Sequence, residues 1–192
     1  MSTLFKQAQE LYDRGFSIIP QRLFLKDKDS KKVTKAPPKS MGWAKYQKQR
    51  VAKAHLLTKW KNYFRNQPGY GVAIITGRLS GLVVVDIDDD AALKIVKACL
   101  PHNFKTVTVQ TGSGGWHLYF RYAEGLKSTA GLGKTGLDIR ADGGYVVAPP
   151  SMFPEPPGGQ YVFAKGRSFD DLEPAIMPEK LRLKLIELIN KH

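Results

Sequence analysis

Leu82-Val83-Val84-Val85-Asp86-Ile87-Asp88-Asp89-Asp90 is the stretch that decides the fold. Its branched apolar residues predict a buried strand, and this strand ends in carboxylates that burial would not tolerate without a neutralising partner. Because side chains alternate across a strand, Asp86 and Asp88 should point to the same face, about 7 Å apart along the chain, with Ile87 pointing into the core. Two carboxylates held in this way can share hard divalent cations such as Mg²⁺ or Mn²⁺.

The last two acidic residues of the stretch have a simpler interpretation. Asp89 or Asp90 fits the N-cap of a helix that the following apolar spacing predicts over residues 90–100. For Asp86 and Asp88 the stretch alone leaves two interpretations open, a metal site and an ordinary strand end, because many folds place carboxylates where strands end.

Length and composition indicate one globular domain. The 192 residues can bury a substantial core, and a hydrophobic content of 42% is ordinary for a soluble protein. No apolar run approaches the roughly 20 residues that cross a bilayer, and the N-terminus lacks the features of a signal peptide, so we expect a cytoplasmic protein without a membrane partner. Cys99 is the only cysteine, which excludes an internal disulfide and a cysteine-based zinc site.

The positive charge is concentrated in the first third of the chain. The formal net charge is +13, and residues 1–65 carry 16 Lys and Arg against 4 Asp and Glu. Such asymmetry favours a polyanion lying against one side of the molecule, as in sequence-independent nucleic-acid binding. A surface that serves solubility, or one that meets an anionic membrane, is the alternative.

Patterns in the first seventy residues predict three regular elements. These are a helix over residues 3–14 that Gly15 ends, a short strand over residues 16–19 that ends at Pro20, and an amphipathic helix over residues 52–64. The lysine-rich segment 26–38 is too long and too charged for a tight connection. We expect it to be either disordered alone or a loop that orders on a ligand.

Aromatic and basic residues are interleaved in Gly42-Trp43-Ala44-Lys45-Tyr46-Gln47. This arrangement can stack on nucleobases and hold phosphates. For Trp43, packing onto the core is the alternative.

The middle of the chain predicts a sheet followed by a glycine-rich turn. Residues 71–77 and 82–88 are expected to be neighbouring strands joined by a short connection, and residues 106–110 an alternating strand. In the turn Thr111-Gly112-Ser113-Gly114-Gly115, the glycines free backbone N–H groups and Ser113 adds a hydroxyl donor, a combination that suits a phosphate.

His117 lies on the strand that follows this turn, where alternation puts it on one face with Tyr119 and Arg121. An imidazole beside a glycine-rich turn suits a phosphate oxygen. A packed histidine in an ordinary hairpin is the alternative.

A third carboxylate lies on a separate strand, residues 136–140, where Asp138 and Arg140 share a face. It would complete a site for a pair of metal ions, and a surface ion pair between Asp138 and Arg140 is the alternative. Residues 142–144 predict a hairpin turn with a returning strand over 145–148. A short strand over 161–163 and a final amphipathic helix over 179–190 follow.

Together these features resemble the primase-polymerase domain of the archaeo-eukaryotic primase superfamily, in the form found in replication proteins of plasmids and phages. The resemblance spans most of the chain. It rests on the ordered series Asp86-x-Asp88, Ser113-Gly114-Gly115-x-His117 and Asp138, together with the lysine-rich and proline-rich loop before Gly42-Trp43 and the stretch from Gly143 to Ser151.

The resemblance implies an α+β (α/β) fold, a primase-polymerase catalytic core with an RRM-like mixed or antiparallel sheet flanked by helices. It implies that Asp86, Asp88 and Asp138 are catalytic and bind two divalent ions, Mg²⁺ or Mn²⁺, with no zinc. The implied nucleotide-binding residues are Ser113, Gly114, His117, Arg140 and Lys35, and the implied nucleic-acid contacts are Lys39, Trp43 and Lys45.

The function implied is a DNA primase-polymerase that transfers nucleotides from (d)NTPs onto a template-bound primer by a two-metal mechanism, in replication of a plasmid, phage or mobile element. The partners implied are template and primer DNA, dNTP or NTP, and a helicase domain or subunit, with the chain acting as a monomer. Two alternatives stay open: a metal-dependent nuclease or phosphohydrolase, and a non-catalytic DNA-binding initiator module.

We expect one catalytic domain over residues 1–192 with three parts. Residues 1–70 form the basic helical and loop part, residues 71–165 the catalytic sheet, and residues 166–192 a C-terminal helical segment.

Overall fold

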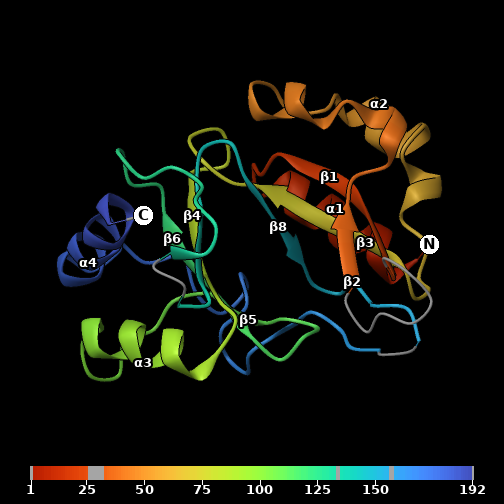
Figure 1. Cartoon of the computed structure of the whole chain (residues 1–192). Helices are drawn as coiled ribbons and strands as arrows, with labels where there is room; N and C mark the ends of the chain where they lie inside the picture. Colours follow the sequence, from red (N-terminus) through yellow and green to blue (C-terminus); the bar gives the residue numbers. More distant parts are fainter. Residues whose placement is uncertain (1, 26–32, 133–134, 156–157, 192) are drawn as a thin grey trace.

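The computed structural model describes residues 2–25, 33–132, 135–155 and 158–191 (Figure 1). The helices are α1 (Thr3–Asp13), α2 (Lys53–Thr58), α3 (Asp90–Cys99) and α4 (Glu179–Asn190), with short 3₁₀ helices η1 (Lys39–Met41), η2 (Trp43–Gln47) and η3 (Lys61–Tyr63). The strands are β1 (Ile18–Leu25), β2 (Val33–Ala36), β3 (Tyr70–Ile75), β4 (Leu82–Ile87), β5 (Thr108–Gln110), β6 (Trp116–Arg121), β7 (Leu137–Arg140), β8 (Tyr145–Ala148) and β9 (Val162–Phe163).

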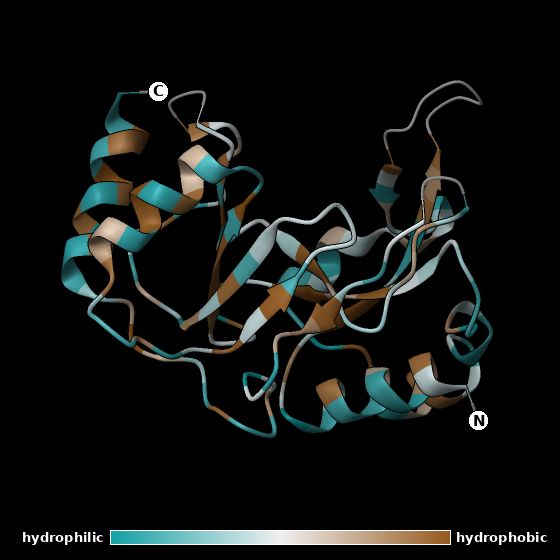
Figure 2. Ribbon diagram, turned by 90° about the horizontal axis from the view of Figure 1, so that it is seen from below, coloured by the Kyte–Doolittle hydropathy of each residue, from teal (hydrophilic) through white to brown (hydrophobic). Residues whose placement is uncertain are grey.

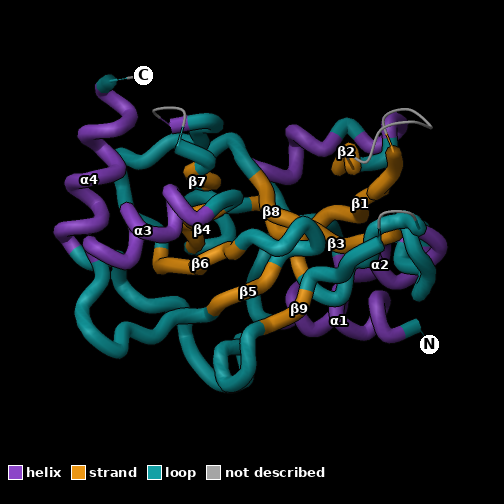
Figure 3. The backbone as a smooth tube through the Cα atoms, turned by 60° about the horizontal axis from the view of Figure 1, so that its bottom comes forward, coloured by secondary structure: helices purple, strands orange, loops and turns teal. Residues whose placement is uncertain are grey.

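Two antiparallel sheets form the centre of the molecule, and the α+β fold class predicted from the sequence is confirmed. The four-stranded sheet has the order β2-β1-β3-β8, and the five-stranded sheet has the order β7-β4-β6-β5-β9. Figure 3 shows the strands of both sheets in the middle of the molecule and the helices on the outside. No helix among the described residues is long and apolar enough to cross a membrane.

The chain crosses between the two sheets at two glycine turns, where hairpins were expected. β3 and β4 belong to different sheets, as do β7 and β8, so the predictions of a neighbouring pair and of a returning hairpin strand are wrong. The two crossings lie side by side: the Thr76 backbone N–H donates to the Gly144 carbonyl at 3.1 Å, and the Thr76 hydroxyl donates to the Ala141 carbonyl at 2.7 Å. Glycine turns fit either arrangement, so local sequence could not decide between them.

The alternation along β4 gives the strand two different environments. Val83, Val85 and Ile87 pack in the apolar core under α3 and α4, whereas Val84 packs in a second core with the four-stranded sheet. Asp86 shares the face of Val84, opposite α3 and α4, because side chains alternate across a strand. The prediction that Ile87 points into the core is confirmed.

The helices cover the outer faces of the sheets. α4 buries Leu181, Leu185 and Leu188 and has the predicted bounds, and α1 buries Leu4, Phe5, Ala8 and Leu11. The N-cap of α3 is Asp89, whose side chain accepts the backbone N–H of Ala92 at 2.8 Å, so the structural interpretation of this residue is confirmed. Figure 2 shows the helices with apolar and polar sides, as expected for elements that cover a core.

The N-terminal elements differ from the sequence predictions at three places. β1 continues through Pro20, which pairs with Val72 on β3 but lies before Arg22, where pairing with β2 begins. The proline therefore removes no ladder hydrogen bond, because its nitrogen faces away from β3, at a position of β1 that does not pair with β2. Residues 33–36 of the predicted loop form β2, and residues 26–32 of that loop lie outside the described residues.

The predicted helix over residues 52–64 is divided into α2 and η3. Leu56, Trp60 and Phe64 are all buried in the same core. Side chains four residues apart lie on one side of an α-helix, which is why the spacing predicted a single helix. The chain instead leaves α-helical geometry after Thr58 and buries Trp60 and Phe64 on either side of η3.

The two crossings approach each other so closely that a side chain at Gly77 should clash with the other crossing. Gly77 has a φ of +99°, and a Cβ added there would collide with Asp142, whose Cα would be only 2.9 Å away. Gly81, in the same connection, has a φ of +67° and open space around it. We expect Gly81→Ala to lower the free energy of unfolding by about 1–2 kcal/mol through backbone strain alone, and Gly77→Ala to lower it by more. Urea denaturation measures both, and equal losses would contradict the described contact.

Candidate active site

The site is built around Asp86 on β4, which lies between β6 and β7 in the five-stranded sheet. The strand register aligns Asp86 with His117 on one side and with Asp138 on the other. Directly paired residues on neighbouring antiparallel strands share a face and lie close together. Three residues far apart in the sequence therefore meet on the face opposite α3 and α4.

Arg140 connects the two carboxylates of this row. Its Nη2 atom lies 2.5 Å from Asp138 Oδ2 and 3.8 Å from Asp86 Oδ2. Asp138 Oδ1 also accepts the backbone N–H of Gly131 at 2.5 Å. The predicted Asp138–Arg140 pair is present, and it is a partly buried pair within the carboxylate cluster instead of an isolated surface pair.

Asp86 is held in its charged form by its neighbours. Burial alone would raise its pKa, but His117, then Arg140 and Lys35, outweigh burial and lower the pKa below the usual value. The contact with His117 is electrostatic: Asp86 Oδ1 lies 3.3 Å from His117 Nε2 but has no hydrogen-bond partner within the described part of the chain. A buried carboxylate oxygen without a partner is free to accept an external ligand.

Asp88 follows the end of β4 and is exposed. Its backbone N–H donates to the Gly136 carbonyl at 2.8 Å, which ties it to the start of β7. Partial burial, and then repulsion from Asp86 and Asp138, raise the pKa of Asp88. The repulsion indicates that the three carboxylates are close enough to interact.

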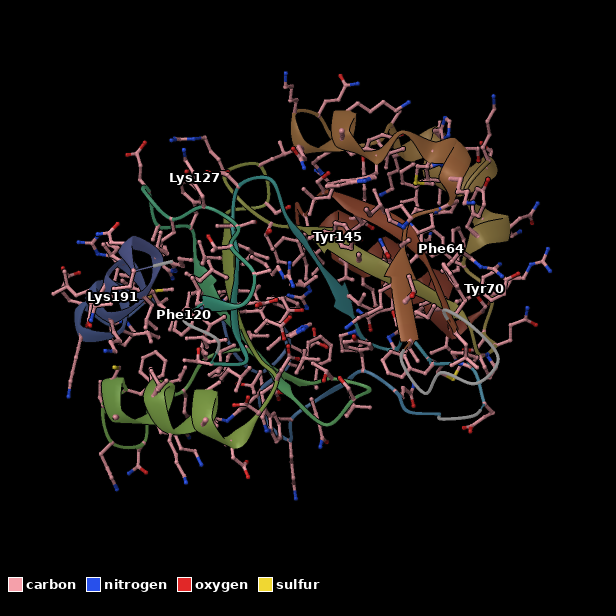
Figure 4. The ribbon with its side chains drawn as sticks, in the orientation of Figure 1. Phe64, Tyr70, Phe120, Lys127, Tyr145 and Lys191 are labelled. Atoms are coloured by element: carbon pink, nitrogen blue, oxygen red, sulfur yellow. The ribbon has the colours of Figure 1, made fainter. Side chains whose placement is uncertain are left out.

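A cavity of about 320 Å³ opens beside Asp86, between the two sheets. The five-stranded sheet contributes Asp86, His117 and Arg140, and the four-stranded sheet contributes Lys35 on β2 and residues 145–147 on β8. The remaining lining residues are Trp43, Ser128, Gly143, Gly144 and Tyr161. Figure 4 labels Tyr145, which lies near the middle of the molecule between the sheets.

Aromatic side chains form one side of this cavity. The rings of Trp43 and Tyr145 meet edge to face with centroids 5.0 Å apart, so Trp43 packs on the protein while still lining the cavity. The buried Tyr161 accepts a hydrogen bond from Lys35 Nζ at 3.2 Å. This bond directs the lysine toward the carboxylates, in agreement with its effect on the pKa of Asp86.

Other predicted site residues lie outside the cavity. Asp88 and Asp138 do not line it, and neither do Ser113 and Gly114. The turn that holds Ser113 and Gly114 lies beside Asp88, because a Cβ on Gly115 would collide with the Ile87 carbonyl and would lie 3.4 Å from Asp88 Cα. Lys39 on η1 and Lys45 on η2 are exposed and also do not line the cavity.

Sequence reasoning missed Tyr145, Tyr161 and Ser128 as lining residues. Tyr145 falls in the stretch from Gly143 to Ser151 that carries the family resemblance, which was a usable signal. Tyr161 and Ser128 come from ordinary strand and loop patterns, and only the three-dimensional arrangement reveals them.

The carboxylates fit hard divalent cations by their chemistry, and Arg140 accounts for the present side-chain arrangement. Among the described residues, no three or more His, Cys, Asp or Glu side chains are grouped so that they could hold a metal ion. The Arg140 guanidinium contacts both Asp138 and Asp86, so a cation of the protein already neutralises them. Carboxylate oxygens suit Mg²⁺ and Mn²⁺, and the unpartnered Asp86 Oδ1 is a suitable ligand atom. A metal ion would have to displace Arg140 from these carboxylates.

Comparison with protein families shows where this chain belongs. Residues 8–180 match the family described as Bifunctional DNA primase/polymerase, N-terminal. The matched segment contains β1 to β9 and every residue that lines the cavity. A comparison with curated proteins gives no match.

The raised pKa of Asp88 predicts a pH-dependent effect on stability. A carboxyl group whose pKa is higher in the folded state makes that state lose stability as the pH rises from the ordinary value of 3.8 through the raised pKa. Asp88→Asn removes this loss. In metal-free buffer, we expect the variant to be more stable than the parent at neutral pH, by less than about 1 kcal/mol because solvent screens the exposed group.

Urea denaturation at a series of pH values measures this difference, which should shrink as the pH falls toward 3.8. A variant that is less stable than the parent at neutral pH would contradict the described repulsion.

Proposed function

The chain belongs to the family of bifunctional DNA primase/polymerase N-terminal domains, and from this premise we propose that it transfers nucleotides from (d)NTPs to a template-bound primer by a two-metal mechanism. One observation carries the proposal. Asp86 is aligned with His117 and Asp138 on three adjacent strands, at the wall of a cavity that also contains Lys35 and Arg140. Carboxylates beside cations suit a reaction in which a negatively charged triphosphate binds next to metal ions.

The size and lining of the cavity support a nucleoside triphosphate as the ligand. Its volume of about 320 Å³ lies at the lower end of the range of about 300–1,000 Å³ for small-molecule sites. Lys35 and Arg140 supply positive charge for phosphate oxygens, and Trp43 and Tyr145 supply flat aromatic surface for a base or sugar. We assign Lys35 and Arg140 to the triphosphate on this basis.

Asp86, Asp88 and Asp138 would hold the divalent ions. When bound, Mg²⁺ or Mn²⁺ supplies activation of the primer 3′-hydroxyl and charge stabilisation of the leaving pyrophosphate. Arg140 would exchange one anionic partner for another, since the guanidinium that leaves Asp138 can bind the triphosphate. His117 holds Asp86 in position from the neighbouring strand and faces the cavity, where it can donate to a phosphate oxygen.

The glycine turn offers a second group of phosphate contacts. Ser113 and Gly114 are exposed in a turn next to Asp88, and Ser113 Oγ lies 3.1 Å from Thr111 Oγ1. The Gly114 backbone N–H already donates to the Thr111 carbonyl at 3.0 Å, so the exposed Ser113 hydroxyl is the donor that this tight turn offers to an anion. We therefore assign Ser113 and Gly114 to the outer phosphates, next to Asp88.

Template and primer DNA would lie along the basic N-terminal part. Lys39 and Lys45 are exposed on η1 and η2, and Trp43 between them faces the cavity. Contacts to the phosphate backbone position a nucleic acid without reading its sequence, as a polymerase requires. The motif resemblance further suggests replication of a plasmid, phage or mobile element, together with a helicase partner.

Substitution of the carboxylates tests the proposed reaction. With Mg²⁺ or Mn²⁺, a primed template and dNTPs or rNTPs, we expect Asp86→Asn, Asp88→Asn and Asp138→Asn each to lower the extension rate by at least about a hundredfold, because several kcal/mol of charge stabilisation are lost. Asp90→Asn is the matched control, since Asp90 lies in the exposed first turn of α3. It should extend primers at the parent rate.

Two results would contradict the proposed reaction. Parent-like extension by the double variant Asp86→Ala, Asp88→Ala would refute nucleotidyl transfer at this site. Degradation of labelled DNA by the parent without added nucleotide would instead identify a nuclease.

A further inference from the structure

A second cavity, of about 260 Å³, lies in the layer formed by η1, η2, α2 and η3. This layer is the orange and gold segment at the top right of Figure 1, beyond β1. The second cavity shares no lining residue with the cavity beside Asp86. It is therefore a separate site, and of the residues that line it only Lys45 has been assigned a role above, in DNA binding.

Four aromatic rings line the second cavity. Tyr46 and Trp60 are buried and meet edge to face, with centroids 5.0 Å apart, so they form the rigid floor of the cavity. His55 lies edge to face on Trp60 at 5.6 Å, and both His55 and Tyr63 are half-buried. The rings of His55 and Tyr63 therefore keep part of their surface open to solvent, and they provide a preformed stacking surface.

The size of the second cavity limits what it can hold. Its volume lies just below the range of about 300–1,000 Å³ that accommodates drug-sized ligands. The aromatic lining suits a flat ring system. These properties fit a single nucleobase better than a complete nucleoside triphosphate.

The surroundings of the second cavity are strongly basic. Lys45 and Lys59 line it and are exposed, and no Asp or Glu occurs in the sequence between Asp29 and Asp86. In the described part of the segment 37–66, the only ion pair is that of Lys53 with Asp13. Cations without carboxylate partners next to open aromatic rings form the combination that binds single-stranded nucleic acid, in which bases stack and phosphates are neutralised.

The helix η2 connects the two cavities. Trp43, at its first position, lines the cavity beside Asp86, and Lys45 and Tyr46 line the second cavity. A single strand that leaves the catalytic cavity past Trp43 would therefore meet Lys45 and the second cavity next. We propose that the second cavity binds one base of single-stranded template DNA, with His55 and Tyr63 stacking on the base and Lys45 and Lys59 holding the flanking phosphates.

This inference rests on the proposed function, because it takes the bound strand to be the template. Its test uses neither nucleotide nor metal ion, so its outcome is independent of primer extension. The affinity of the full chain for fluorescent oligo(dT) is measured by anisotropy at several salt concentrations. Tyr63→Ala should weaken binding by roughly five- to a hundredfold, as expected for the loss of base stacking.

Matched controls separate stacking from charge and from folding. Tyr63→Phe keeps the ring and should bind like the parent, and thermal unfolding shows whether Tyr63→Ala remains folded. Lys59→Ala should reduce the slope of log affinity against log salt by about 0.7, the value for one phosphate contact on a single strand. Lys180→Ala, on the exposed surface of α4 at the far end of the molecule, should leave affinity and slope unchanged.

An abasic strand of equal charge gives the sharpest comparison. If Tyr63 stacks on a base, Tyr63→Ala and the parent should bind the abasic strand equally while differing on oligo(dT). Photocrosslinking of iodouracil-containing DNA to the parent, which requires no substitution, should label the segment 55–63. Equal binding of oligo(dT) by Tyr63→Ala and parent, a similar loss on the abasic strand, or crosslinks only outside this segment would overturn the inference.

Discussion

The rest of the structure depends on one constraint, a carboxylate that is almost completely buried in the middle of a sheet. Asp86 is 8% exposed and retains its charge because His117, Arg140 and Lys35 surround it. A buried charge without such neighbours would be expelled or neutralised. The strand order β7-β4-β6 supplies two of these neighbours, His117 on β6 and Arg140 on β7, whereas Lys35 comes from β2 in the other sheet.

The two glycine crossings place the four-stranded sheet opposite the buried carboxylate. If β3–β4 and β7–β8 were hairpins, all four strands would lie in one sheet and no cavity would form beside Asp86. Because the chain crosses instead, β8 and β2 face the carboxylates and bring Tyr145 and Lys35 to the opposite wall. The fold thus puts the carboxylates on one sheet and contributes Lys35 and the Tyr145 ring from the other, which is the arrangement on which the proposed binding of a triphosphate rests.

Several features could be predicted from the sequence because they are local. The alternation of β4, the N-cap of α3 by Asp89 and the bounds of α4 follow from periodicity and capping, and the structure agrees with them. The proximity of Asp86, His117 and Asp138 came from the family resemblance, because periodicity does not give strand order.

The features that could not be predicted are those that depend on contacts between residues far apart in the sequence. Glycine turns permit both hairpins and crossings, so the division of strands between two sheets was missed. β2 has only four residues, too few for a clear pattern, and it forms a strand by pairing with the edge of β1. The Arg140 guanidinium between two carboxylates and the hydrogen bond from Lys35 to Tyr161 also depend on contacts between strands remote in sequence.

The most direct test of the account is a crystal structure of the protein soaked with Mn²⁺ and a non-hydrolysable deoxynucleoside triphosphate, with manganese located by anomalous scattering. The account predicts a manganese signal against Asp86 and Asp138, with Arg140 moved from Asp138 to the triphosphate. A nucleotide bound elsewhere, or manganese absent from these carboxylates while the Arg140–Asp138 pair persists, would contradict it.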